Sequence, residues 1–336
     1  MIEPAQPAPP PQDPVRVSVL LLAYQQQRYA AASTAACLAL EGGPYEIIFS
    51  DDGSTDGTFE TLQAAAAAYR GPHRVRVRRN ERNLGIGLHY NALVAESTGE
   101  LLLTAAADDL SLPDRVLRTV AAWEAHDRRP DLIAGHLLDL TDDGQLHGEL
   151  RVDDLAQWQG PQDWARQRPY VVGAAHAFTR RLWDRFGPFD PDLFYEDQIL
   201  TFRAIVSGGA ITVDAPLVQY RRGGTSARPQ FESVEQQRAW TARQLRRHLA
   251  EMRRLTADAE LAGCREIVEA HLARESRRKT YHLAVIEARN HAERWALARS
   301  ASDLPLWWRS RKVLHEVWPE FSFRLRRGGR APRRKA

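Results

Sequence analysis

From residue 15 onward the chain alternates short apolar runs with longer segments of helical periodicity. The apolar runs read VRVSVLLLA, YEIIFS, RVRVRR and ELLLTA, and the periodic segments span 26–40, 56–69, 86–97 and 113–126. Short runs rich in branched apolar residues are typical of strands, and the longer segments are typical of helices. A regular alternation of the two predicts an α/β fold with a doubly wound, mainly parallel sheet flanked by helices.

Beyond residue 131 the pattern becomes less regular and then changes in kind. The runs DLIAGHLLDL, YVVGAAHAF and LVQY can extend the same sheet, with a short helix near 180–186 and another from about 195. From about 231 the composition is rich in Glu, Arg, Ala and Leu with helical periodicity. We therefore divide the chain into a disordered proline-rich leader (1–14), an α/β domain (15–228), a helical C-terminal region (229–320) and a basic tail (321–336).

Composition narrows the class of protein. Of the 336 residues, 43% are apolar and 26% are charged, which is ordinary for a soluble globular chain. Cys37 and Cys264 lie far apart without metal-ligand spacing, so neither a disulfide framework nor a zinc site is expected, and a reducing compartment suits them. No signal peptide and no apolar run of about 20 residues is found. These features predict a cytoplasmic protein.

Three acidic pairs carry the candidate chemistry: Asp51 with Asp52, Asp108 with Asp109, and Glu196 with Asp197. The first two pairs directly follow predicted strands, and ligands bind at the carboxyl ends of the strands in sheets of this kind. Adjacent like charges repel and need a counter-ion. Oxygen ligands without His or Cys nearby indicate a hard cation, Mg²⁺ or Mn²⁺, shared with substrate phosphates.

Structural explanations compete with this chemistry. The run FSDDGSTDGT is also typical of a strand that ends in an Asx turn before a capped helix. One of Asp108 and Asp109 can cap the helix that follows, and Glu196 suits the first turn of a helix by its charge.

Four motifs in order resemble those of family 2 glycosyltransferases with a GT-A fold. They are VSVLLLAY, IIFSDDGSTDGT, RNLGIGLHYNALVAESTGELLLTAAADD and YEDQILTFRAIVSGG, and the resemblance covers about residues 15–228. It implies an inverting glycosyltransferase of the hexosyltransferase class, with 15–228 as its catalytic domain.

The resemblance implies a role for each matching position. The nucleotide would be held by the backbone around Ala23 and Tyr24, by the Asp51 carboxylate and by the neighbouring Asp52. Asp108 and Asp109 occupy the place of the metal-binding Asp-x-Asp element, although Ala106 replaces its usual first acidic residue. Which of the two carboxylates binds the ion directly stays open. Asp197 matches the general base that activates the acceptor hydroxyl.

Five further residues are weaker candidates. Asn83, in the run NLGIGLHYN, either lines the nucleotide pocket or belongs to a loop at a helix start. His176 is either a core histidine or an acceptor contact, and Glu196 is either an acceptor contact or a solvated helix residue. Arg221 precedes a glycine-rich segment, and Ser226 lies in it. This segment either closes over the diphosphate or forms an exposed turn.

The activity implied is metal-dependent transfer of a sugar from a UDP- or dTDP-sugar to a hydroxyl of a glycan or lipid-linked acceptor, in surface polysaccharide synthesis. A catalytically inactive nucleotide-sugar-binding protein is the alternative. A nucleotidyltransferase is disfavoured because LAYQQQRY lacks a basic glycine-rich loop, and no recognised nucleic-acid-binding motif is present.

The C-terminal segment LPLWWRSRKVLHEVW combines Trp307 and Trp308 with Arg309, Arg311 and Lys312. Interfacial tryptophans beside basic residues are typical of a segment that lies on an anionic membrane. Peripheral contact with the inner face of the membrane would suit a lipid-linked acceptor. In the alternative, the tryptophans pack the segment onto the rest of the protein.

Overall fold

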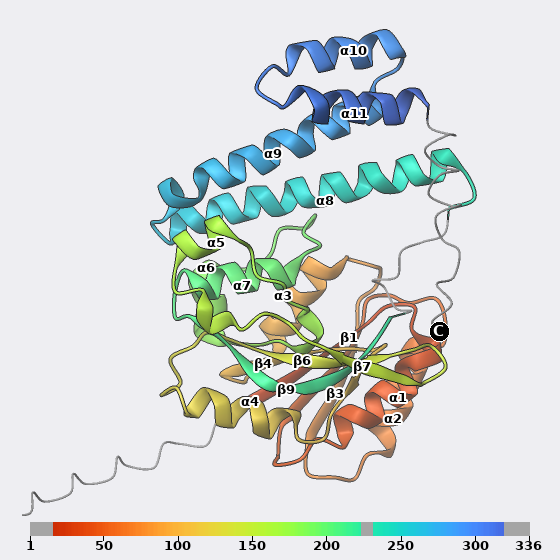
Figure 1. Cartoon of the computed structure of the whole chain (residues 1–336). Helices are drawn as coiled ribbons and strands as arrows, with labels where there is room; N and C mark the ends of the chain where they lie inside the picture. The colour runs from red at the N-terminus through yellow and green to blue at the C-terminus, as the bar shows by residue number, and fades with distance from the viewer. Residues whose placement is uncertain (1–15, 223–230, 319–336) are drawn as a thin grey trace, which may run out of the picture.

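The computed structural model describes residues 16–222 and 231–318. The leader 1–14, Ser226 and the basic tail 321–336 lie outside these residues. The described part consists of one mixed sheet with helices on both faces and a helical region stacked on one side (Figure 1). The predicted α/β class and the helical C-terminal region are confirmed.

Nine strands form the sheet, in the order β3-β2-β1-β4-β8-β6-β9-β5 with β7 paired to β6. Six of them run in one direction, and β5, β7 and β8 run against their neighbours. The bounds are β1 Val17–Ala23, β2 Glu46–Asp51, β3 Arg74–Arg79, β4 Leu101–Ala106, β5 Leu110–Ser111, β6 Leu132–Leu140, β7 Leu146–Leu150, β8 Ala177–Thr179 and β9 Ala210–Arg221.

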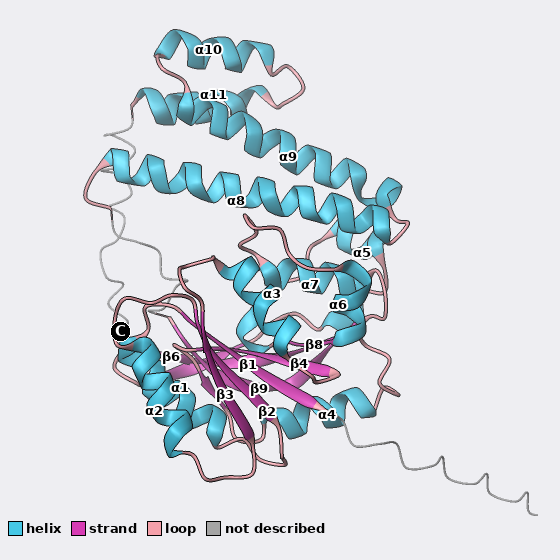
Figure 2. Ribbon diagram, turned by 180° about the vertical axis from the view of Figure 1, so that it is seen from behind, coloured by secondary structure: helices cyan, strands magenta, loops and turns pink. Residues whose placement is uncertain are grey.

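Helices cover the two faces of the sheet, because the central strands are apolar on both sides (Figure 2). One core packs under α1 Gln27–Leu38, α2 Thr58–Ala68 and α4 Arg115–Glu124. The other core packs under α3 Ile86–Glu96, α6 Arg180–Phe186 and α7 Glu196–Ile205, with the short α5 Pro161–Arg166 beside it. The four expected βα helices are present with nearly the predicted bounds.

The C-terminal region is built from α8 Val234–Leu261, α9 Arg265–Glu287, α10 His291–Ser300 and α11 Leu306–Val317. Met252 and Leu255 of α8 and Val268 of α9 belong to the same buried cluster as the helices on the sheet. Arg203 of α7 and Asp258 of α8 form a fully buried ion pair with Nε to Oδ2 at 2.8 Å. The helical region therefore shares a core with the α/β domain.

The region 141–221 differs from the sequence prediction in detail. The polar excursion after residue 141 contains the strand β7, and YVVGAAHAF supplies only β8, preceded by a 3₁₀ turn at Gly173–Ala175. The last strand, β9, is longer than LVQY because it runs through Pro216. A register shift in β6 near His136, the partner of Pro216, accommodates this proline, which cannot donate to the ladder.

Helix α11 buries some of the apolar residues of the C-terminal segment and exposes others. Trp308 packs against Tyr281, and Val313 is buried in the cluster between α9, α10 and α11. Trp307 and Leu306, by contrast, are 67% and 66% exposed. Among residues 16–222 and 231–318, no helix combines the length and the apolar character that crossing a membrane requires.

Candidate active site

The carboxyl ends of β1, β2 and β4 lie side by side at one edge of the sheet. In the parallel register Ala23 pairs with Asp51, and Leu22 pairs with Ala106. The residues that follow these strands are therefore brought together, namely Tyr24, Asp52 and the run to Asp109. Sequence reasoning expected this convergence from the acidic strand ends alone.

The segment after β1 interlocks with the loop after β2. Gln25, at φ 55°, donates its backbone N–H to Ser54 Oγ at 2.9 Å, and its side-chain amide bonds both the hydroxyl and the N–H of Thr55. The left-handed φ of a non-glycine residue is sparsely populated and is held here by these three bonds. Sequence reasoning did not single out Gln25, because its partners lie 29 and 30 residues away.

The Asp51 side chain is fully buried, but only one of its two carboxylate oxygens has a hydrogen-bond donor. Its Oδ2 lies 3.1 Å from Arg79 Nε and accepts the Ser54 N–H at 3.0 Å. Its Oδ1 is buried without a hydrogen-bond partner. A buried carboxylate oxygen without a donor is costly. An N–H of a pyrimidine base would satisfy it, so this position fits the predicted nucleotide contact.

Asp52, the next residue, is used differently. One oxygen accepts from Asn80 Nδ2 at 2.7 Å and from the Leu84 N–H at 2.9 Å, and the other accepts from the Gly85 N–H at 3.0 Å. Both oxygens therefore hold the loop 80–85 at the start of α3. The Asn83 side chain is exposed on this loop. Asp52 thus has a structural function in addition to the predicted nucleotide contact.

Asp108 and Asp109 are both buried just beyond β4. Gln26 Nε2 lies 3.4 Å from Asp108 Oδ2, and the Arg221 N–H donates to Asp109 Oδ1 at 2.8 Å. Burial, together with the neighbouring charge of Asp108, raises the pKa of Asp109 well above its usual value. Two adjacent carboxylates with this repulsion fit a hard divalent cation, which takes oxygen ligands.

The described residues contain no group of three or more His, Cys, Asp or Glu side chains placed around one point as metal ligands. Two carboxylates leave most positions of a six-coordinate ion to water and to substrate phosphates. That division is common for Mg²⁺.

Two arginines surround this acidic pair. Arg221 donates Nε to the Asp108 carbonyl at 3.0 Å and lies over the Tyr29 ring at 4.5 Å, so its guanidinium holds the β4 and β9 ends together. Arg115, which sequence reasoning missed, is only 2% exposed and donates to the Thr104 carbonyl at 2.6 Å. Its charge opposes the rise in the pKa of Asp109.

His176 is buried beside Arg115 and is not placed as a proton carrier. Burial, followed by the charge of Arg115, lowers the pKa of His176 to about 3. The ring is therefore neutral at physiological pH. Its backbone carbonyl accepts the Thr104 N–H at 3.1 Å, which ties the segment 173–176 to β4. Of the two interpretations of His176, its surroundings favour the core histidine.

Glu196 and Asp197 open α7 on the other side of the segment 173–176. A Cβ built on Gly173 would lie 3.0 Å from Asp197 Cβ, so this glycine permits close contact with the acidic pair. Burial raises the pKa of Asp197 to about 6, and burial followed by the charge of Asp197 raises the pKa of Glu196 to about 8. A carboxylate whose pKa is raised toward neutrality is a stronger base.

Residues of helix α8 lie beside this acidic pair. The sequence did not indicate this contact. Glu251, 2% exposed, pairs with Arg168, and its charge raises the pKa of Asp197 while that of Arg168 lowers it. Tyr195 donates its hydroxyl to Gln244 Oε1 at 2.9 Å and lies against the His248 ring at 4.6 Å. The helical region is thus part of the site's construction.

The fold is of the GT-A type, a mainly parallel sheet flanked by helices. Residues 18–135 match the family model described as Glycosyl transferase family 2. The match contains the strand ends with Asp51, Asp52, Asp108 and Asp109, while Asp197 lies beyond it.

Two curated relatives align with parts of the chain. EpsE of Bacillus subtilis is 32% identical over 33% of this chain and 39% of its own length. An undecaprenyl-phosphate 4-deoxy-4-formamido-L-arabinose transferase of Klebsiella pneumoniae is 38% identical over 33% of this chain and 35% of its own. This chain thus spans well under half the length of these two relatives.

Two solved structures share the fold over nearly the whole chain. S. aureus TarS 1–349 in complex with UDP-GlcNAc has a TM-score of 0.53, with 15% identity over 92% of both chains. The mannosyltransferase PcManGT from Pyrobaculum calidifontis in complex with GDP-Man and Mn²⁺ has a TM-score of 0.52, with 17% identity over 94% of this chain and 91% of that one.

Proposed function

We propose that the protein is a metal-dependent inverting glycosyltransferase that moves a sugar from a UDP- or dTDP-sugar to a hydroxyl of a glycan or lipid-linked acceptor. The observation that carries this proposal is the placement of the acidic pairs. The buried Asp51, with one unpartnered oxygen, and the pair Asp108–Asp109 lie at the sheet edge, and Asp197 lies across the segment 173–176. The family match and the names of the relatives, one acting on undecaprenyl phosphate, support it.

The residues take separate roles in this reaction. Asp51 Oδ1 accepts an N–H of the base, and Tyr24, 41% exposed beside Ala23, lies along the nucleoside. Asp108 and Asp109 would hold Mg²⁺ or Mn²⁺, which when bound neutralises the diphosphate leaving group. Asp197 takes the proton from the acceptor hydroxyl as that oxygen bonds to the anomeric carbon and the bond to the diphosphate breaks.

This reaction needs no covalent intermediate with the protein, because a single displacement inverts the anomeric centre. The acceptor side is bounded by Tyr195 of the loop before α7 and by His248 of α8. An aromatic ring in this position can stack on a sugar face. The name of the relative that acts on undecaprenyl phosphate supports a lipid-linked acceptor.

The proposal is tested with Asp197→Asn and with Asp192→Asn as its matched control. Asp192 is an exposed carboxylate five residues earlier that pairs with Arg253 on the surface. Nucleoside diphosphate release is measured with a panel of nucleotide sugars and Mn²⁺. We expect Asp197→Asn to lower turnover by about 10² or more with nearly unchanged donor affinity, since only the base is lost. Wild-type turnover in this variant would refute the assignment, and release from no donor would favour the inactive binder.

A further inference from the structure

Helix α8 carries two arginines whose surroundings differ from those of its other arginines. Four of its six arginines form ion pairs, namely Arg238 with Glu316, Arg246 with Glu287, Arg253 with Asp192 and Arg254 with Asp258. Within residues 16–222 and 231–318, Arg243 and Arg247 form no such pair with a carboxylate. They lie one helical turn apart, where like charges repel each other. Two neighbouring positive charges of this kind favour an anionic ligand.

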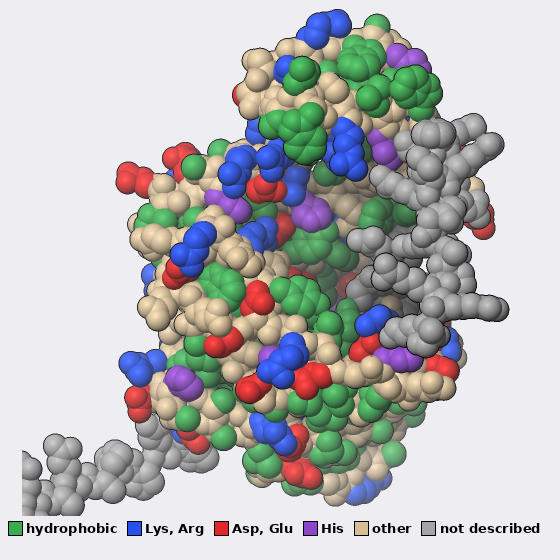
Figure 3. All heavy atoms as spheres, in the orientation of Figure 1, with side chains coloured by type: hydrophobic (Ala, Val, Ile, Leu, Met, Phe, Trp, Pro, Cys, Tyr) green, Lys and Arg blue, Asp and Glu red, His purple; other side chains and the backbone are tan. Residues whose placement is uncertain are grey.

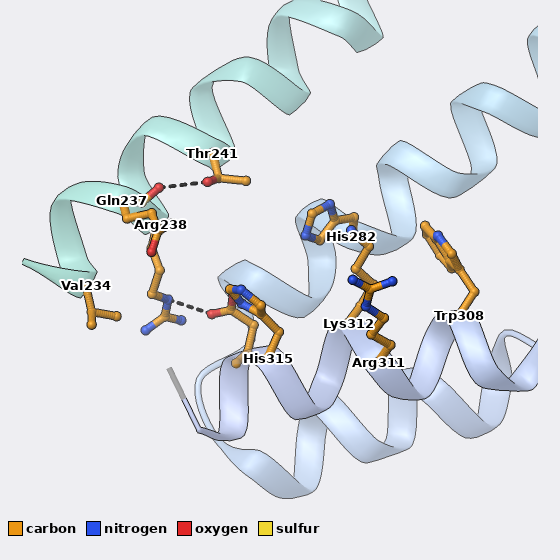
Figure 4. Close-up of a pocket in the computed structure, with 10 residues that line it drawn as sticks. Val234, Gln237, Arg238, Thr241, His282, Trp308, Arg311, Lys312 and His315 are labelled. Atoms are coloured by element: carbon orange, nitrogen blue, oxygen red, sulfur yellow. Dashed lines mark hydrogen bonds and ion pairs between the residues drawn. The ribbon is translucent and has the colours of Figure 1, made fainter. Parts of the chain in front are cut away.

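The N-terminal half of α8 is held by α9 and α11 on one side. Figure 4 shows the pocket between α8, α9 and α11, with Arg238 of α8 pointing toward α11. Arg238 Nε lies 2.9 Å from Glu316 Oε2, and Arg238 also donates to the Ile286 carbonyl of α9 at 2.7 Å. By helical spacing, Arg243 and Arg247 lie on the side of α8 away from Arg238. They are therefore presented by a helix that is fixed from behind.

Arg247 reaches the loop that leads into α7. Its guanidinium carbon lies 3.5 Å from the centre of the Phe194 ring. The next residue, Tyr195, donates its hydroxyl to Gln244 Oε1 of α8 at 2.9 Å. Phe194 and Tyr195 directly precede the acidic pair that opens α7. Stacking on an aromatic ring fixes the plane of a guanidinium and leaves the N–H groups at its edge to bind a ligand.

Electrostatic effects connect Arg247 with the proposed base. Burial, followed by the charge of Glu251, raises the pKa of Tyr195 to about 12, while Arg247 lowers this pKa and Asp197 raises it. Burial lowers the pKa of Arg247, and the charge of Arg243 lowers it further. Such effects weaken with distance. Tyr195 therefore lies near both Asp197 and Arg247, and Arg247 lies near Arg243.

We propose that Arg243 and Arg247 bind a phosphate group of the acceptor while the acceptor hydroxyl lies at Asp197. Figure 3 shows the surface hollowed between the helical region and the α/β domain, with Lys, Arg and His side chains on the helical side. Two guanidinium groups give several charge-assisted hydrogen bonds to one phosphate, whose negative charge relieves their mutual repulsion. Uncharged sugar hydroxyls would leave that repulsion in place. The identity of the ligand as the acceptor rests on the proposed glycosyl transfer, whereas the phosphate binding itself does not.

The test measures phosphate binding by calorimetry on the full chain, without donor or divalent metal. Two probes separate the sources of phosphate: geranyl phosphate stands for a lipid carrier, and glucose 1-phosphate stands for a phosphorylated glycan. Geraniol and glucose are their uncharged counterparts. The variant Arg243→Gln with Arg247→Gln removes both charges. The control, Arg246→Gln with Arg253→Gln, removes two charges of the same helix that are paired with exposed carboxylates.

We expect the variant of Arg243 and Arg247 to lose at least about tenfold in affinity for one or both phosphates, while the control stays within about twofold, because two charged donors are lost. Gln244→Glu still accepts from the Tyr195 hydroxyl but adds a negative charge beside Arg247, so it is expected to weaken the same binding. Loss for geranyl phosphate alone assigns the phosphate to a lipid carrier, and loss for glucose 1-phosphate alone assigns it to a glycan.

Equal affinity of the double variant and its control would overturn the inference, as would equal binding of the uncharged counterparts or a wild type that binds neither phosphate. Release of nucleoside diphosphate with Mn²⁺ is measured separately on the wild type. Phosphate binding without such release refutes the proposed transfer and keeps the anion site, whereas release without phosphate binding refutes this inference alone.

Discussion

At the scale of single residues, the surroundings of a carboxylate decide its function. Asp51 and Asp52 are adjacent and both buried, yet Asp52 uses both oxygens to hold the loop 80–85, whereas Asp51 keeps one oxygen without a partner. Asp108 and Asp109 are likewise adjacent and buried, and burial, followed by the charge of Asp108, raises the pKa of Asp109. The pair is therefore better suited to a cation than to structural support.

The acidic pair is tested by replacing both residues, Asp108→Ala with Asp109→Ala. The affinity for a nucleoside diphosphate in the presence of Mn²⁺ is expected to fall at least tenfold, since the ion loses its protein ligands. The affinity without Mn²⁺ is expected to stay unchanged, and calorimetry measures both. Asp142→Ala with Asp143→Ala removes an exposed adjacent pair and serves as the control. Equal Mn²⁺ dependence in both double variants would place the ion elsewhere.

At the scale of elements, α8 links the helical region to Asp197, the proposed base. Burial is the largest cause of the raised pKa of Asp197. The charge of Glu251 on α8 raises this pKa further, and the charge of Arg168 in the loop after α5 lowers it. As the proposed general base, Asp197 works only when deprotonated, so we expect activity to be lost as the pH falls through its folded-state pKa of about 6.

The variant Glu251→Gln tests this link. Removal of a negative charge lets Asp197 deprotonate more readily, so the acidic limb of kcat/KM is expected to shift to lower pH. The measurement is the pH profile of nucleoside diphosphate release. Glu260→Gln, on the same helix but paired with Arg265, is expected to leave the limb in place. A limb that does not move in Glu251→Gln would show that α8 does not influence the base.

At the scale of the whole molecule, the α/β domain and the helical region form a continuous core. Leu255 of α8 and Phe202 of α7 belong to one buried cluster. Asp258 accepts from Arg203 at 2.8 Å and from Arg254 Nε at 2.9 Å, and both Asp258 and Arg203 are fully buried. A shared core of this kind predicts that both parts unfold together.

The variant Asp258→Asn is expected to lower the free energy of unfolding by about 3–5 kcal/mol, because it leaves the buried Arg203 charge without its counter-ion. Asp303→Asn breaks the surface pair with Arg277 and is expected to cost far less, because exposed ion pairs contribute little to stability. Urea denaturation followed by fluorescence and circular dichroism measures both. Similar costs for the two variants, or two separate transitions in the wild type, would contradict a shared core.

The sequence by itself determined the α/β class, the four βα units and the convergence of Asp51 with Asp108 and Asp109. These features depend on local signals, since the apolar runs and the residues after them are contiguous in the chain. The carboxyl ends of parallel strands necessarily meet at one edge of the sheet. The family resemblance rested on the same contiguous motifs.

Only the tertiary structure decided which carboxylate oxygens are already satisfied and which elements complete the site. The contacts of Asp52 with Asn80 and of Gln25 with Ser54 join residues about 30 positions apart, and Arg168 meets Glu251 across 83 positions. No local pattern encodes such pairs. The pocket between α8, α9 and α11 likewise depends on how three helices cross, which packing determines and helical periodicity does not.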